Sequence, residues 1–217
     1  MNASQSPHRL RSEDPDRLRS GSPNRLRSGG LLLAAAFVAL TGLSACAGSK
    51  GVVYNKNFTA GYSPSSLAAL RTPLLVETFG APAAGVSQEA VTASTVEGLR
   101  NSGPRWTQIG YSADPSDAPN PPYRLRFAYG APNAFARSDL CAEDLVAGDV
   151  GSDAENRRTV VALCRGERYV SIAEGSAGAN ADIESRAFGE FVGTIGRQVM
   201  PRNNPVVEKE CLFRICD

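Results

Sequence analysis

The amino-acid sequence predicts an α+β domain, a two-layer sandwich in which two helices lie on one face of a mainly antiparallel sheet of about five strands. Residues 123–129 (YRLRFAY) place large apolar side chains at every second position, which is the periodicity of a strand with one buried face. Residues 183–199 instead carry an apolar residue at every fourth position, which predicts an amphipathic helix. Several strand-like segments lie between this helix and an earlier one, and that order favours helices gathered on one side of a sheet.

The first firm strand and the first helix follow each other in the chain. Residues 73–79 (PLLVETF) form an apolar run of strand length that ends at Gly80. Ser87 can cap a helix over residues 87–102, which Gly103 and the following proline end. Because this helix has few large apolar side chains, we expect its backbone to lie close to the sheet.

The middle of the chain is predicted to contain two strands separated by a loop. Residues 106–111 form the second strand, and residues 114–122, which are rich in proline and aspartate, form the loop. Residues 123–129 form the third strand, with one face in the core and the other exposed to solvent. Arg124 and Arg126 fall on the exposed face, so they form the candidate interaction surface of the predicted domain.

The last third of the chain combines an acidic segment, a hairpin and the final helix. Residues 131–156 are predicted to be a solvated loop, because their acidic residues do not have the spacing of a calcium-binding EF-hand. Residues 159–164 and 168–174 predict a hairpin with a glycine in its short turn. In the final helix, Gly189 and Gly193 are expected to allow close packing on the sheet.

The N-terminal region has the features of an export signal that ends at a cysteine. Six arginines lie within the first 30 residues, and residues 31–43 (LLLAAAFVALTGL) carry no charge. This run is too short for a membrane-spanning helix, which needs about 20 residues, but it matches the central region of a secretory signal. The sequence Leu43-Ser44-Ala45-Cys46 completes it and resembles the lipobox of bacterial lipoproteins.

The lipobox resemblance implies a lipid-anchored protein. Cleavage before Cys46 leaves that cysteine to carry the lipid, and Ala47 after it implies the periplasmic face of the outer membrane. Two or more acyl chains anchor a protein stably without a transmembrane helix. Residues 1–45 are predicted to be a signal peptide with an extended basic n-region. Residues 46–71 are predicted to be the lipidated cysteine and a tether, which contains one short edge strand near 52–58. The α+β domain follows at 72–200, and a disulfide-closed tail at 201–217.

The cysteines that follow Cys46 are predicted to form disulfides. They are Cys141, Cys164, Cys211 and Cys216. An even number of cysteines in an oxidising compartment is typical of disulfides, and the spacing lacks the CxxC pairs or histidines of a zinc site, so no metal is expected. Four cysteines allow three connectivities, and sequence separation favours Cys141 with Cys164 and Cys211 with Cys216.

Charge and histidine content argue against several classes of function. Removing the six arginines and three acidic residues of the leader from the 23 basic and 22 acidic residues leaves 17 and 19, a net charge of −2. A cationic surface for nucleic acid is therefore not expected. The only histidine, His8, lies in the leader, so the mature chain lacks the residue most used in general-base and nucleophilic catalysis. We expect a protein that is not an enzyme and that has no cofactor.

The predicted domain is similar to a group of α+β domains of the bacterial envelope. The lipobox, the strands at 73–79 and 123–129, the helix capped by Ser87 and the final amphipathic helix carry this similarity. The group comprises the N-terminal domain of the Tol-system translocation protein, curli-secretion lipoproteins and auxiliary lipoproteins of lipid transport. The similarity implies an adaptor that contacts the membrane through Cys46 and binds an envelope protein through a sheet edge or loops.

Two other functions stay open at the level of sequence, a lipid- or glycan-binding lipoprotein and a histidine-independent enzyme. If the structure has an apolar pocket between the helices and the sheet, that pocket favours the lipid-binding function. If the structure is instead a flat domain with an exposed edge strand, it favours the adaptor function.

Overall fold

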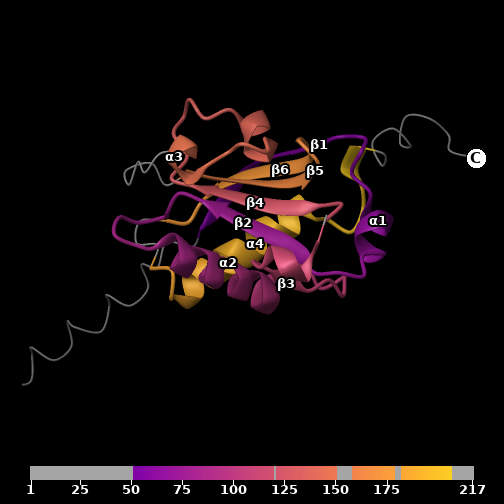
Figure 1. Ribbon diagram of the computed structural model, residues 1–217, viewed down its shortest axis with the longest axis horizontal. Helices are drawn as coiled ribbons and strands as arrows, with labels where there is room; N and C mark the ends of the chain where they lie inside the picture. The colour runs from indigo at the N-terminus through magenta and orange to yellow at the C-terminus, as the bar shows by residue number, and fades with distance from the viewer. Residues whose placement is uncertain (1–50, 120, 151–157, 179–181, 207–217) are drawn as a thin grey trace, which may run out of the picture. The chain divides into compact units, whose positions relative to one another are not determined.

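The computed structural model describes residues 51–119, 121–150, 158–178 and 182–206 (Figure 1). The chain divides into two units, Met1–Ala45 and Cys46–Asp217, and every described residue belongs to the second. Cys46, Cys211 and Cys216 lie outside the described residues. In the described part of the chain, no helix has the length and apolar character needed to cross a membrane.

The described residues form six strands, four α-helices and two short 3-10 helices. In chain order these are β1 (Val52–Phe58), α1 (Pro64–Ala68), β2 (Leu74–Phe79), α2 (Gln88–Ser102), β3 (Tyr111–Ser112), η1 (Pro115–Asp117), β4 (Arg124–Tyr129), η2 (Arg137–Cys141), α3 (Ala147–Val150), β5 (Arg158–Arg165), β6 (Arg168–Ser176) and α4 (Arg186–Val199). The α+β fold class is confirmed. The predicted strand at 106–111 is wrong, because only β3 pairs there, and the Trp106 side chain donates to the carbonyl of Met200 after α4 at 2.9 Å.

All six strands belong to one mixed sheet in the order β1-β6-β5-β4-β2-β3. The pairs β1–β6, β6–β5 and β5–β4 are antiparallel, whereas β2 runs parallel to both β4 and β3. Parallel neighbours need a crossover connection, and α2 supplies it between β2 and β3. The sheet therefore has one strand more than predicted and two parallel pairs within a mainly antiparallel arrangement.

α2 and α4 together cover one face of the sheet (Figure 1). Ser87 and Ser185 cap these helices, and each side-chain oxygen accepts a hydrogen bond from a backbone N–H three residues later. The core beneath the helices contains Phe127 and Tyr129 of β4 and Phe191 of α4, all buried. The prediction that both helices lie on one face of the sheet is therefore confirmed.

Glycines allow α2 and α4 to approach each other closely. A Cβ added to Gly193 would lie 2.3 Å from the Cβ of Ser102, and one added to Gly98 would lie 3.0 Å from the Cβ of Val192. The expectation that Gly189 and Gly193 pack on the sheet is therefore wrong. The large apolar side chains of α4 already occupy the side that faces the sheet, so its small residues face the neighbouring helix.

The segment between β4 and β5 covers the other face of the sheet. Within residues 131–150, Leu140, Cys141 and Val150 are fully buried in an apolar cluster with Ala162 of β5 and other sheet residues. Figure 1 shows this segment on the side of the sheet opposite α2 and α4. The described part of the predicted solvated loop is thus a third layer, which we call the cover segment (residues 131–150).

The predicted tether at 46–71 belongs to the fold from residue 51 onward. A Cβ added to Gly51 would lie 2.3 Å from Cδ2 of Phe191, so the chain already contacts α4 at this point. β1 follows directly and pairs with β6, and Tyr62 and Leu67 are buried in the main core. The many Gly, Ser and Ala residues of this segment suggest a tether, but its few large side chains are enough to pack it against the rest of the fold.

Candidate functional site

Arg124 and Arg126, the predicted interaction surface, lie on the face of the sheet that the cover segment occupies. The side chain of Arg126 is 3% exposed and that of Arg124 is 17% exposed. The expectation that this face of β4 is open to solvent is therefore wrong. Alternation along a strand separates its two faces, but it does not reveal whether another segment covers the polar one.

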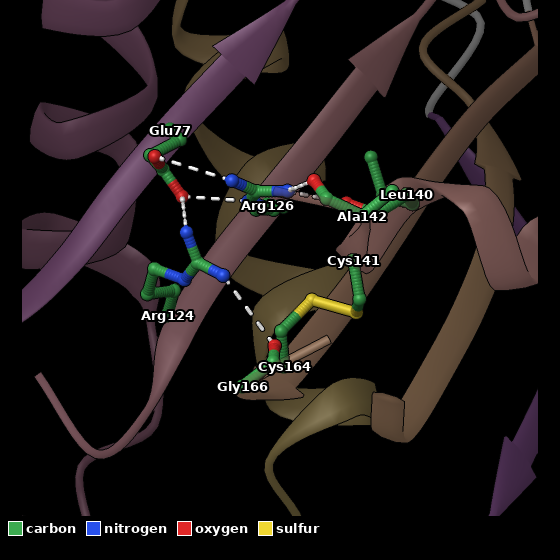
Figure 2. A network of polar contacts seen from close by, with 8 residues as sticks. All are labelled: Glu77, Arg124, Arg126, Leu140, Cys141, Ala142, Cys164 and Gly166. Carbon is green, nitrogen blue, oxygen red and sulfur yellow. Dashed lines mark hydrogen bonds and ion pairs between the residues drawn. A yellow bond between two sulfur atoms is a disulfide. The ribbon is translucent and has the colours of Figure 1, made fainter. Parts of the chain in front are cut away.

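Arg126 connects β2, β4 and the cover segment (Figure 2). Its Nε donates to Oε2 of Glu77 on β2 at 2.7 Å. Its Nη1 donates to the carbonyl oxygens of Leu140, at 3.2 Å, and of Ala142. The guanidinium also lies 5.4 Å from the centroid of the Phe79 ring. A single buried arginine thus satisfies two backbone carbonyls of the cover segment and one carboxylate of the sheet.

A disulfide fastens the cover segment at the residue between those two carbonyls. Cys141 bonds to Cys164 of β5, with 5.6 Å between their Cα atoms, and both cysteines are buried. This is the pairing that sequence separation favours. Arg124 lies opposite Cys164 in the β4–β5 register and donates to the carbonyl of Gly166 at 3.4 Å. The disulfide and the Arg126 hydrogen bonds therefore hold the same stretch of chain, as Figure 2 shows.

A second charged cluster holds the beginning of the cover segment. Arg137 and Arg158 both bind the carboxylate of Glu174 on β6, and Nη2 of Arg158 lies 3.0 Å from Oε1. Arg158 also donates to the carbonyl of Pro132 at 2.7 Å. Burial raises the pKa of Glu174, but the hydrogen bonds and positive charges of the two arginines outweigh this effect and lower the pKa overall. Sequence reasoning missed this cluster because its members come from three separate segments.

The charged side chains of both clusters are committed to holding the fold. Among the described residues, no buried side-chain nitrogen or oxygen lacks a hydrogen-bond partner. The same part of the chain contains no group of three metal-ligating side chains. Lys56 lies on β1 and donates to Oε1 of Gln198 at 3.1 Å. The contacts of both clusters join separate segments of the fold.

Two hollows lie on the outer side of the helix pair, and both are lined largely by polar residues. The larger has a volume of about 570 Å³ and is bounded by residues of α2 and of α4 and the segment before it, including Glu97, Asn101, Glu184 and Glu190. The smaller, of about 410 Å³, continues beside Arg105 toward the C-terminal half of α4. Neither hollow lies between the helices and the sheet, where an apolar ligand would be shielded from water.

β1 is a long edge strand that is exposed to solvent. It pairs with β6 on one side and has no neighbour on the other among the described strands. Five of its seven residues are exposed, and Val52 and Tyr54 are two of the exposed large hydrophobic residues, at 59% and 56%. The opposite edge, β3, has only two residues and both are buried. β1 is therefore the longer and more accessible edge of this sheet.

The β1–β6 ladder determines which backbone groups of β1 face outward. The N–H of Thr59 donates to the carbonyl of Val170 at 2.9 Å. Because antiparallel strands alternate inward and outward groups, the N–H of Asn57 also points to β6, whereas those of Lys56 and Phe58 point away. The Phe58 N–H meets its neighbour's side-chain oxygen, Oδ1 of Asn57, at 2.9 Å. The Lys56 backbone is thus the central free position of this edge.

The chain was compared with protein-family models, with curated proteins and with solved structures. None of the three comparisons gives a match. A function is therefore inferred from the residues of this chain alone.

Proposed function

We propose that this protein is a non-catalytic adaptor of the bacterial envelope, anchored to the periplasmic face of the outer membrane by a lipid on Cys46. We further propose that it binds an extended segment of another envelope protein along β1. The observation that carries this proposal is the exposed seven-residue edge of β1. Such an edge offers unpaired backbone donors and acceptors to which a peptide can add as a further strand.

The side chains of β1 fit this role. Asn55, Lys56 and Asn57 are polar and exposed, so the edge stays solvated when no partner is bound. Tyr54 precedes these residues and, being 56% exposed, offers ring surface to a partner strand. The lipid-binding alternative has less support, because the space between helices and sheet is filled by side chains such as Phe127, and the hollows are lined largely by polar residues.

The lipid anchor is tested on the mature N-terminus. We expect mass spectrometry of the protein from a lipoprotein-processing host to find an acylated Cys46. Cys46→Ser should accumulate as the unprocessed precursor, because no other cysteine lies beside the apolar run of the leader. An unmodified N-terminus at any other residue would contradict the anchor.

The edge is tested by two proline substitutions at adjacent positions, one that removes an outward backbone N–H and one that removes an inward N–H. Lys56→Pro removes an outward N–H, which edge strands tolerate, so the domain should fold and lose its partner. Asn57→Pro removes an inward N–H, so it should lower the melting temperature. Lys56→Ala is the matched control for the side chain and should keep the partner.

The partner is detected by a photoreactive residue at Tyr54, which cross-links whatever lies along β1 in intact cells. We expect the same cross-linked species with the unsubstituted chain and with Lys56→Ala, and its loss with Lys56→Pro. A cross-link that persists in a folded Lys56→Pro protein would rule out strand addition at β1.

A further inference from the structure

The sheet has two ends of different character. β2, β4 and β6 finish at one end, where β1 and β5 begin. The loops that leave β2 and β4 at this end, residues 80–87 (GAPAAGVS) and 130–136 (GAPNAFA), contain no charged residue. We call it the uncharged end after these two loops. At the opposite end, the entry to β2 carries Arg71, residues 165–168 (RGER) form a charged turn, and Arg202 follows α4.

The N-terminal chain enters the fold at the uncharged end. Val52 starts β1 there, and Gly51 already contacts Phe191. Only residues 47–50 (AGSK) separate Gly51 from Cys46. Five residue steps of fully extended chain span at most roughly 18 Å. A lipid on Cys46 therefore keeps this end of the sheet close to the bilayer surface.

The surface of the uncharged end fits that position. Ala84, Asn133 and Ala134 are exposed in its two loops, and Val52 and Tyr54 are exposed at the start of β1. Small uncharged groups lose little hydration free energy when lipid headgroups displace water from them, whereas charged groups would lose much more. Tyrosine is also enriched at membrane–water interfaces.

Other segments at this end carry charge: Asp182 and Glu184 lie in the loop that leaves β6, and Arg158 begins β5. Glu89 is in the first turn of α2, and Glu184 directly precedes the N-cap of α4. Arg137 begins η2 and is paired with Glu174. The neutral surface at this end is therefore made by the loops that leave β2 and β4.

We infer that the uncharged end of the sheet lies against the lipid headgroups, with the opposite, charged end directed away from the membrane. This inference rests on the proposed acylation of Cys46. It places β1 with its start near the bilayer and its C-terminal end away from it, so that a partner strand approaches along the membrane normal.

The orientation is tested with tryptophan fluorescence in the full-length, lipidated protein. Ala134→Trp places a reporter at the uncharged end, and Glu167→Trp is the matched control at the opposite end; both keep Trp106, which contacts the end of α4. Each protein is reconstituted into phosphatidylethanolamine–phosphatidylglycerol vesicles whose acyl chains carry bromine, a quencher of tryptophan. We expect a loss of fluorescence for Ala134→Trp, and none for Glu167→Trp or the unsubstituted chain.

A Gly/Ser insertion after Lys50 tests whether the short link holds the domain in place. We expect a long insertion to reduce the quenching of Ala134→Trp to the level of the control; unchanged quenching would overturn this part of the inference. If Cys46 is acylated and Ala134→Trp is quenched no more than Glu167→Trp, the orientation is wrong and the anchor stands. If mass spectrometry finds no acyl group on Cys46, the proposed anchor itself is wrong.

Discussion

The two faces of the sheet are covered by different means. Aromatic and aliphatic side chains fill the face under α2 and α4, whereas on the other face a smaller apolar cluster is joined by one disulfide and two ion-pair clusters that hold the cover segment. Apolar burial is spread over many contacts and has no preferred direction. A disulfide or a buried ion pair depends on particular atoms. The cover segment should therefore be separable from the rest of the fold by a few substitutions.

Phe191→Ala should have the largest effect, because it removes a side chain that is 2% exposed at the centre of the helix-covered face. Truncation of a buried phenylalanine costs about 3–5 kcal/mol. Urea unfolding of the mature protein measures this loss. A midpoint equal to that of the unsubstituted protein would show that the apolar stripe of α4 does not hold this face.

Loss of the disulfide should have the next largest effect. The double substitution Cys141→Ala with Cys164→Ala opens a loop with a sequence separation of 23 residues. Closing a loop of this size stabilises a protein by about 3 kcal/mol. Hydrogen exchange should show lost protection in the cover segment, while α2 and α4 keep theirs. Equal loss in α4 would mean that the two faces unfold together.

Arg126→Met should destabilise the protein by about 1–3 kcal/mol, because it leaves two carbonyl oxygens of the cover segment without their donor. Arg124→Met is the matched control on the same face of β4, and its longer, more exposed contacts should cost about 0–1 kcal/mol. Thermal melts compare the two variants. On an exposed face, exchanging both arginines for glutamate would leave the fold intact. Because Arg126 is buried under the cover segment, we expect this double substitution to unfold the cover segment.

Acidic pH should lower the stability of the face under the cover segment by a smaller amount than these substitutions. The pKa of Glu174 is lowered in the folded protein, so its contribution to stability is present above the usual glutamate pKa of about 4.3 and is lost as pH falls through the folded value. Glu174→Gln should reduce the fall of the melting temperature in this acidic range. An unchanged pH dependence would show that other carboxyl groups account for it.

Much of the local structure could be predicted from the sequence because its signals lie within a few residues. Ser87 caps α2, and the C-cap Gly103 follows it, as expected. The hairpin of β5 and β6 turns at Gly166, whose φ of 58° suits glycine. The edge strand at 52–58 and the Cys141–Cys164 pairing also follow from nearby composition and spacing. Acylation of Cys46 stays a prediction.

The arrangement of these elements depends on contacts between distant residues, and only the tertiary structure decided it. Arg126 is buried because Leu140 and Ala142 fold back over β4, a contact that the alternation of one strand cannot report. The glycines of α4 face α2 because the aromatic residues take the sheet side. The sequence by itself determined the longer strands and helices, namely β2, β4, β5, β6, α2 and α4, since backbone propensity, caps and periodicity are local properties. Which face each side chain meets depends on what packs against it, and that partner comes from elsewhere in the chain.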